Sequence, residues 1–404
     1  MNQFIARQPI FDRHMKVYAY ELLHRSNSTQ NFADVRENPN KASSETMVIG
    51  FHNIGIAKIT GGRRAFVNFT EQLLEAGVAT LFPHEHLVVE ILENVRPTET
   101  VIEACRQLKK KGYMLALDDF VLSDEMAPLL KLADIIKVDW LATPPREIPK
   151  LLSSVKPLTP CFLAEKIETK EAYEAALSMG FSLFQGYFFS KPTIISKKKA
   201  EPLMAHYLQL IRLANCEDVE FCELANIIRR DAVLTYRLLR LVNSAYFGMQ
   251  YQVSDIQNAL VILGLRETRK WVSLLAMMGI CADKTEELVR VSLIRGRTLE
   301  LFCKRFLTGE DAGNYFLIGL FSLLNIILDS SMSDVMLGLS VPHEVSSALT
   351  DGQGRAARLL QLLEVYERGQ WDALREHCDH LGLSPEDLSK LYLEAVLWCG
   401  EFTT

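Results

Sequence analysis

Short apolar runs alternate with amphipathic stretches over the first 192 residues. The apolar runs have the length of strands and cover Val17–Leu23, Arg64–Phe69, His86–Ile91, Tyr113–Leu117, Ile135–Val138, Cys161–Ala164 and Leu183–Gly186. Between them, segments such as Thr98–Lys111 and Lys170–Met179 carry apolar residues at helical spacing. This alternation predicts an α/β fold with a parallel sheet and crossover helices, and so many units indicate closure into a TIM-like (β/α)8 barrel.

Polar residues follow nearly every apolar run. They are Glu21, Asn68, Glu90, Asp118, Asp119, Lys137, Asp139, Glu165, Glu168 and Gln185. In such a barrel the carboxyl ends of the strands meet at one mouth, where the chemistry gathers. Each residue alone has a structural alternative; Glu21 could start a helix and Asn68 could cap one. Together they predict an acidic ring with one amide and one lysine, which suits a divalent cation and an anionic substrate.

The run Leu115–Phe120, L-A-L-D-D-F, is the centre of this pattern. An apolar strand stops there on two adjacent carboxylates, which repel each other unless a cation, a basic side chain or water lies between them. At the end of a parallel strand this pair suits oxygen ligation of Mg²⁺ or Mn²⁺. The alternative is a turn in which one Asp caps the next helix.

The pattern changes after Pro192. Residues 193–202 carry three lysines and end on a proline, so they are predicted to be a solvated linker. From residue 203 to 404 the apolar residues recur at helical spacing, as in Leu317–Leu328, which predicts an all-α domain.

Three positions in this second half carry helix-boundary signals. Asp231 and Ser254 are expected to cap helices, because short polar side chains satisfy the free N–H groups of a first turn. Gly264 is expected to end one helix before another begins.

Composition narrows the class of protein. The 404 residues suffice for two domains. A net charge of −6 argues against direct nucleic-acid binding, which needs a clustered basic excess. Since the chain has neither an apolar run of about 18 residues nor a signal-peptide core, no membrane association is expected. The eight cysteines form no C-x-x-C pair and are expected to be reduced thiols of a cytoplasmic protein.

The motifs of residues 1–192 resemble an EAL domain, a barrel that binds and often hydrolyses cyclic di-GMP. Glu21–Arg25, E-L-L-H-R, fits the family's E-x-L-x-R signature, with Leu22 where the family has Ala. The other matches, in the family's order, are Q-P-I at Gln8–Ile10, V-N-F-T, V-E-I-L-E, L-D-D-F, I-I-K-V-D, A-E-K-I-E-T and F-Q-G-Y-F-F-S-K-P.

The resemblance implies a role for each matching residue. The positions of the metal ligands, for Mg²⁺ or Mn²⁺ with Ca²⁺ as a non-catalytic substitute, are Glu21, Asn68, Glu90, Asp118 and Asp119. Lys137 and Glu165 would orient or deprotonate the attacking water. Arg25 would meet a phosphate of the ligand, Gln8 would lie along a guanine, and Gln185 would complete the pocket. In active relatives, hydrolysis of one phosphodiester bond gives the linear dinucleotide pGpG.

One loop departs from the family. Active members continue D-D-F-G-T-G, whereas this chain has Val121, Leu122 and Ser123 after D-D-F. Glycines permit backbone angles that Val and Leu resist, so this loop cannot follow the same path. Weak or absent turnover is therefore expected, with binding of the nucleotide kept.

Asp231–Gly248, D-A-V-L-T-Y-R-L-L-R-L-V-N-S-A-Y-F-G, resembles the core signature of HDOD domains. These are helical relatives of HD phosphohydrolases that have usually lost the metal site. Where the His-Asp pair would fall, this chain has Ser322 and Leu323, which cannot hold a divalent cation usefully. The second half is therefore expected not to be an enzyme. Asn243 either contacts a partner or holds a local turn, and the structural role is favoured.

Three hypotheses follow. In the first, the barrel binds cyclic di-GMP with weak or no turnover and the HDOD domain signals to an unidentified protein partner, in the family's usual setting of motility or biofilm formation. In the second, the chain is an active metal-dependent cyclic di-GMP phosphodiesterase. In the third, it is an adaptor for which the nucleotide is irrelevant. A homodimer is compatible with each of them.

Overall fold

The computed structural model describes residues 3–26, 55–120, 123, 125–144, 146–155, 161–186, 201–216, 218–244, 247, 252–280, 286–328, 330–339 and 341–402. Its strands are β1 (Gln3–Asp12), β2 (Val17–Ser26), β3 (Arg64–Phe69), β4 (Leu87–Ile91), β5 (Met114–Leu117), β6 (Ile135–Asp139), β7 (Cys161–Glu165) and β8 (Leu183–Phe184). The helices of this half are α3 (Ile56–Thr60), α4 (Glu71–Glu75), the 3-10 helix η2 (Val78–Leu81), α5 (Glu99–Lys110), α6 (Ala127–Leu130), α7 (Ile148–Val155) and α8 (Lys170–Met179).

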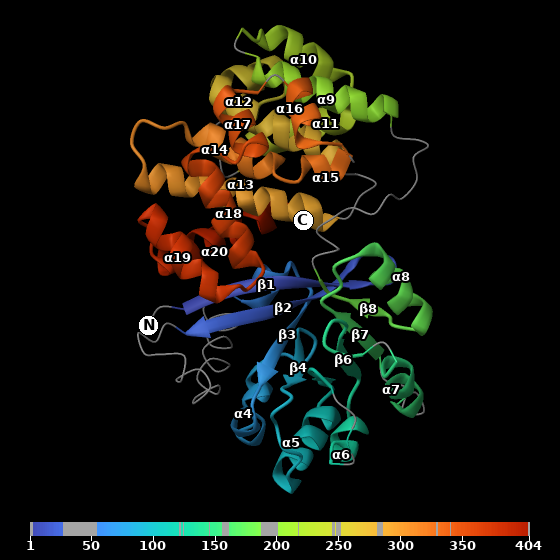
Figure 1. Ribbon diagram of the computed structural model, residues 1–404. Coiled ribbons are helices and arrows are strands. Elements are labelled where there is room, and N and C mark those ends of the chain that lie inside the picture. Colours follow the sequence, from blue (N-terminus) through green and yellow to red (C-terminus); the bar gives the residue numbers. More distant parts are fainter. Residues whose placement is uncertain are drawn as a thin grey trace.

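The eight strands close into a barrel in chain order, with helices α4 to α8 around its outside (Figure 1). This confirms the TIM-like barrel. One strand was not predicted: β1 runs antiparallel to both of its neighbours, β2 and β8. The apolar pattern misses β1 because Arg7, Gln8 and Pro9 interrupt it, and a proline within a run argues against a strand.

The second half is helical throughout its described residues, as predicted. Its helices are α9 (Glu201–Asn215), α10 (Phe221–Arg229), α11 (Ala232–Val242), α12 (Ile256–Ile280), α13 (Glu286–Phe306), α14 (Ala312–Phe321), α15 (Leu324–Leu328), α16 (Met332–Leu339), α17 (His343–Thr350), α18 (Gly354–Glu367), α19 (Trp371–Leu381) and α20 (Pro385–Phe402). The predicted linker, 193–202, lies outside the described residues except for the first two residues of α9. The domain boundaries at residues 192 and 203 therefore stay predictions.

The boundary signals of this half are borne out at two of three positions. Asp231 caps α11 by accepting hydrogen bonds from two backbone N–H groups of its first turn. Gly264 has a φ of 71° and interrupts α12, a conformation that favours glycine. The cap predicted at Ser254 is wrong: Asp255, one residue later, accepts the backbone hydrogen bond at the start of α12.

Asn243 has the structural role that the sequence favours. Its side-chain amide donates hydrogen bonds to the carbonyl oxygens of Leu239 and Val253, and its oxygen accepts one from the Val253 N–H. The side chain therefore joins the end of α11 to the segment before α12.

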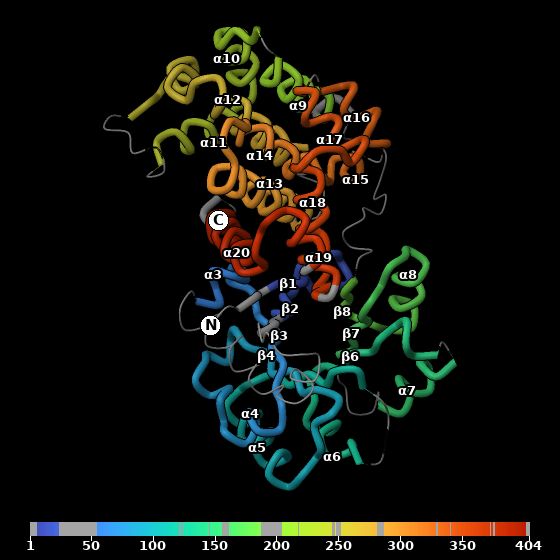
Figure 2. The backbone as a smooth tube through the Cα atoms, turned by 60° about the vertical axis from the view of Figure 1, so that its left-hand side comes forward, coloured from blue at the N-terminus to red at the C-terminus, as the bar shows by residue number. Residues whose placement is uncertain are grey.

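The β1–β2 hairpin and helix α3 contact the helical half. Figure 1 shows the hairpin between the other strands and helices α18, α19 and α20, and Figure 2 shows α20 close to α3 and the hairpin. Ala6 of β1 is fully buried in the core of the helical half, and Leu23 of β2 packs against that core. Leu393 of α20 packs in turn against the barrel core. Apolar side chains thus cross the boundary in both directions.

No described helix is long and apolar enough to span a bilayer.

Candidate functional site

Two successive layers of inward-facing side chains fill the barrel. The first is apolar, with one residue from each strand: Ile10, Ala19, Phe66, Val88, Ala116, Ile135, Leu163 and Leu183. Side chains alternate along a strand, so the residue two positions away faces inward again. Counting backwards in antiparallel β1 and forwards in the other strands, those residues are Gln8, Glu21, Asn68, Glu90, Asp118, Lys137, Glu165 and Gln185. The predicted site residues in this set therefore form one polar ring above an apolar floor.

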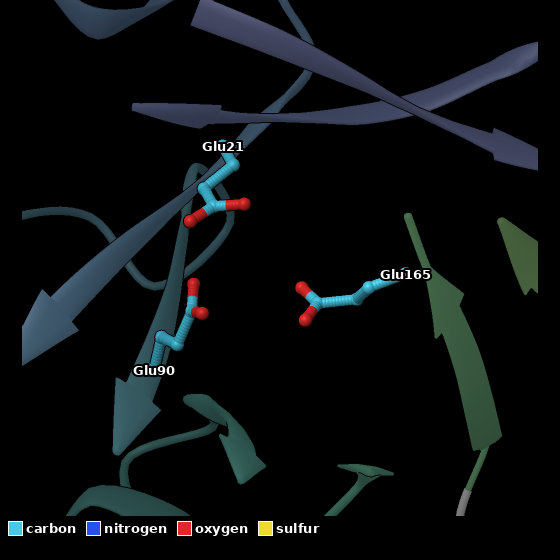
Figure 3. A group of neighbouring side chains, drawn as sticks. All are labelled: Glu21, Glu90 and Glu165. Atoms are coloured by element: carbon cyan, nitrogen blue, oxygen red, sulfur yellow. The ribbon is translucent and has the colours of Figure 1, made fainter. Parts of the chain in front are cut away.

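Two groups of carboxylates converge in this ring. Glu21, Glu90 and Glu165 point toward one another from β2, β4 and β7 (Figure 3), and each offers an oxygen within 4.8 Å of the other two. Asp118, Asp119 and Glu165 form a second group within the same distance. Glu165 belongs to both groups, so the two clusters are continuous.

Lys137 lies at the centre of the acidic ring. Its Nζ is 2.8 Å from Asp118, 2.6 Å from Glu165 and 3.7 Å from Glu21, and it also contacts Glu90. The side chain is 2 % exposed. Burial lowers the pKa of this amine, but the surrounding carboxylates outweigh burial and hold the pKa well above its usual range. Lys137 is therefore a cation that offsets part of the negative charge.

One lysine cannot satisfy four carboxylates, and the remaining oxygens suit a hard cation. Glu90 Oε2 and Asn68 Oδ1 are buried without a hydrogen-bond partner, which is costly unless something else contacts them. Burial and the neighbouring acids raise the pKa of Glu90 above its usual range and that of Glu165 to about 7. An all-oxygen donor set is what Mg²⁺, Mn²⁺ and Ca²⁺ prefer. The residues present fit divalent cations.

Gln185 joins a predicted ligand-binding position, Gln8, to a predicted metal ligand, Glu21. Its Nε2 donates hydrogen bonds to Gln8 Oε1 at 2.9 Å and to Glu21 Oε2 at 2.8 Å. Its own oxygen is buried without a partner. The backbone of Arg25 lies in β2, but its side chain is outside the part that the structure describes.

Asp119 begins the loop that departs from the family pattern. Its φ is 39°, a left-handed conformation that is uncommon outside glycine and clusters at functional sites. Burial, followed by the charge of Asp118, raises the pKa of Asp119. After Phe120, the residues Val121 and Leu122 lie outside the described residues.

Sequence reasoning missed a second left-handed residue, Lys166. It follows Glu165 directly, has a φ of 56°, and donates a hydrogen bond to Asp139. Although burial acts in the opposite direction, that bond and two backbone N–H groups hold the pKa of Asp139 below its usual range. Placement next to Glu165 at a strand end was the available signal for Lys166.

The polar ring opens into a cavity of about 530 Å³. Its barrel wall includes Gln8, Glu21, Asp118, Glu165 and Gln185. Eight carboxylates and five cationic side chains line the whole cavity, so its formal charge is −3. An anionic ligand therefore needs additional positive charge in order to bind there.

The helical half forms the rest of this cavity wall. Helix α13 contributes Glu287 and Arg295, the end of α18 contributes Glu367, and the following turn contributes Arg368 and Gln370. No local pattern in the sequence could identify these residues, because their contacts with the barrel are between segments far apart in the chain.

Ser322 and Leu323, the positions expected to correspond to the His-Asp pair of HD phosphohydrolases, adjoin this wall. Leu323 lines the cavity. Ser322 donates its hydroxyl to the Gly319 carbonyl and accepts a hydrogen bond from Arg295 at 3.3 Å. Leu323 therefore contributes an apolar surface to the wall, and Ser322 links Arg295 of α13 to the end of α14.

Comparison with known proteins gives the same two domains. A family model for the EAL domain matches residues 20–192, and one for the HDOD domain matches residues 201–324. "Uncharacterized protein YuxH" of Bacillus subtilis (strain 168) is 36% identical over 99% of this chain and 98% of its own length. "Cyclic di-GMP phosphodiesterase CdgJ" of Vibrio cholerae is 33% identical over 98% of this chain and 92% of its own length.

Among solved structures, the FimX EAL domain of Pseudomonas aeruginosa bound to c-di-GMP is similar at 17% identity and a TM-score of 0.37. The similarity covers 46% of this chain and 89% of that one.

Proposed function

The chain belongs to the family of proteins that join an EAL domain to an HDOD domain, and from this premise we propose that its barrel binds cyclic di-GMP with weak or no turnover. The helical domain then transmits the bound state to a protein partner. The observation that carries the proposal is the convergence of carboxylates from β2, β4, β7 and the end of β5 in one ring, which opens into the cavity.

The metal ligands in this proposal are Glu21, Asn68, Glu90, Asp118 and Asp119, with Mg²⁺ or Mn²⁺ as the resident ions. When bound, such cations would neutralise phosphate charge and lower the pKa of a bound water. The cavity charge of −3 supports a need for cations, because cyclic di-GMP is itself an anion.

The remaining polar residues of the mouth orient the nucleotide. Gln8 lies along a guanine, and Gln185 fixes Gln8 and Glu21 relative to each other through its two hydrogen bonds. Arg25 contacts a phosphate, where a guanidinium can make two parallel hydrogen bonds.

Weak turnover is proposed because of the loop after Asp118 and Asp119. The family's glycines are replaced by Val121, Leu122 and Ser123. Asp119, at the start of this loop, already has a left-handed backbone without the freedom of glycine. A small misplacement of a ligand-holding loop is enough to slow chemistry while leaving binding intact.

Titration calorimetry with cyclic di-GMP in the presence of Ca²⁺ tests the binding claim, since Ca²⁺ occupies such sites without supporting turnover. We expect a dissociation constant of about 10 μM or tighter. The absence of binding heat at tens of micromolar would contradict the proposal.

The second candidate is an active cyclic di-GMP phosphodiesterase. The observation that favours it is that every acidic position of the motif is retained, and the relative CdgJ carries that activity in its name. Here Glu165 would accept a proton from the attacking water, and Lys137 would help to orient that water.

A hydrolysis assay with saturating Mn²⁺ separates the two candidates. Sustained formation of pGpG that Glu21→Gln and Glu165→Gln each abolish would establish the enzyme. Product that neither substitution affects would come from a contaminant.

A further inference from the structure

The outer wall of the cavity belongs to the helical half of the chain. The turn between α18 and α19, Arg368–Gln370, lies directly over the barrel mouth. Gly369 has a φ of 67°, and a Cβ placed on it would lie 2.9 Å from Leu23 Cδ1 and 3.8 Å from Gln8 Nε2. Glycine therefore allows this turn to approach β1 and β2 closely.

The wall behind this turn is held by ion pairs of the buried Arg295. Arg295, whose side chain is 7 % exposed, makes hydrogen bonds to both carboxylate oxygens of Glu367, with its Nη2 2.6 Å from Oε2. It also lies 3.4 Å from Glu364. Such a two-point contact fixes the end of α18 against α13. The turn consequently starts from a rigid support.

The β1–β2 hairpin, which forms the barrel side of the cavity, is also fixed to α13. Tyr20 donates a hydrogen bond to Glu287 of α13. Arg7 lies 4.6 Å from the centre of the Tyr20 ring and 4.0 Å from Glu287. The two walls of the cavity, one from each domain, thus have a defined spacing.

We propose that the turn Arg368–Gln370 is a second subsite, which binds the half of cyclic di-GMP that lies outside the metal cluster. The inference rests on the proposed function. Cyclic di-GMP has two phosphates and two guanines, so a ligand with one phosphate at the metals has a second phosphate and guanine for the rest of the cavity wall to contact. A volume of about 530 Å³ lies within the range of roughly 300–1,000 Å³ found for small-molecule sites.

The chemistry of the turn fits this half of the ligand. An arginine side chain can make two hydrogen bonds to a phosphate or to O6 and N7 of a guanine. Arg368 lines the cavity with a side chain that is 40 % exposed, and its Nη2 is 3.8 Å from Glu364. Gln370 adds an exposed amide beside it. A nucleotide bound to both domains would link occupancy of the barrel to the position of the helical half.

Calorimetry on the full-length chain tests this subsite. Cyclic di-GMP is titrated in the presence of Ca²⁺ into wild type, Arg368→Ala, Gln370→Ala and the control Arg358→Ala. Arg358 is an exposed arginine on α18, the helix that leads into the turn, and it does not line the cavity. We expect binding about ten-fold weaker for Arg368→Ala, a smaller loss for Gln370→Ala, and wild-type affinity for Arg358→Ala.

Binding of Mn²⁺ alone, measured on the same proteins, separates a ligand contact from a structural effect. The proposal requires all variants to bind Mn²⁺ as wild type does, because the proposed metal ligands belong to the barrel and the turn belongs to the helical half. Arg368→Ala with wild-type affinity for the nucleotide, or with an equal loss of Mn²⁺ binding, would overturn the subsite alone. A wild-type chain that does not bind cyclic di-GMP would overturn the proposed function and the subsite with it.

Discussion

The hydroxyl of Tyr20 in the barrel donates a hydrogen bond to the carboxylate of Glu287 in the helical half, 267 positions along the chain. Tyr20 faces away from the barrel interior, whereas the next residue, Glu21, faces the acidic ring. One strand, β2, therefore carries both a contact between the domains and a proposed metal ligand. A shift of β2 on cation binding at Glu21 would therefore also move the contact between Tyr20 and Glu287 of the helical half.

The Tyr20–Glu287 contact is expected to stabilise the docking of the two halves. Because a hydrogen bond to a charged, buried group contributes about 1.5–3 kcal/mol, Tyr20→Phe should lower the free energy of unfolding by about 2 kcal/mol in urea titrations. Glu394→Gln, which breaks an exposed pair with Arg305, is the control and should cost less than about 1 kcal/mol. Equal losses for the two variants would argue against a special role for the Tyr20 contact.

Lys137 is expected to stabilise the metal-free barrel. Lys137→Met leaves three buried carboxylates and the partly buried Asp118 without their shared cation, which should cost about 3–5 kcal/mol in the presence of EDTA. Added Mn²⁺ should restore stability to this variant more strongly than to wild type, since the cation replaces the lost charge. Thermal unfolding with EDTA and with Mn²⁺ measures both effects.

Lys109→Met is the matched control for Lys137→Met. Lys109 pairs with Asp134 alone among the described contacts of its amine, at a partly exposed site outside the ring. Its loss should cost less than about 1 kcal/mol and should not respond to Mn²⁺. A Lys137 variant that behaves in the same way would contradict the electrostatic account of the ring.

The altered loop is expected to limit turnover. Replacing Val121, Leu122 and Ser123 by Gly, Thr and Gly restores the family's backbone freedom, and it should raise the rate of pGpG formation with Mn²⁺ about ten-fold or more. The affinity for cyclic di-GMP with Ca²⁺ should stay within about three-fold of wild type, because the metal ligands are unchanged. An unchanged rate in a variant that binds normally would show that this loop is not the cause.

Glu300 is expected to make the helical half sensitive to acid. It accepts hydrogen bonds from Lys270, Arg297 and Lys304, and although burial acts in the opposite direction these cations hold its pKa at about 2. A folded pKa below the unfolded value means that the stabilisation is complete above pH 4.5 and is lost as the pH falls toward 2.

Unfolding of wild type and Glu300→Gln across this pH range tests the prediction for Glu300. The difference in free energy of unfolding between them should shrink by on the order of 3 kcal/mol from pH 5 to pH 2. A difference that stays constant with pH would show that Glu300 contributes through packing alone.

Much of the barrel and of its ring could be predicted from sequence, because both depend on local periodicity. Each apolar run supplies an inward residue to the floor, such as Val88, and a polar residue two positions later, such as Glu90. The strand β1 could not be found in this way, since Pro9 and its polar neighbours obscure the alternation. Yet β1 contributes Gln8 to the same ring.

The contacts between the halves had no sequence signal at all. Arg368 and Gln370 belong to a polar turn whose composition is ordinary for the surface of a helical domain. Their position over the barrel mouth depends on tertiary packing of the β1–β2 hairpin against α13, α18 and α20. The left-handed backbone of Asp119 likewise depends on its tertiary setting, because no glycine marks it.

The central claim, that side chains from several strands converge to hold cations, is tested most directly by anomalous diffraction from crystals grown with Mn²⁺. We predict anomalous peaks inside the barrel mouth, within about 2.5 Å of oxygens of the two groups that share Glu165. A well-ordered ring with no anomalous peak, or with Mn²⁺ bound only elsewhere on the chain, would contradict it.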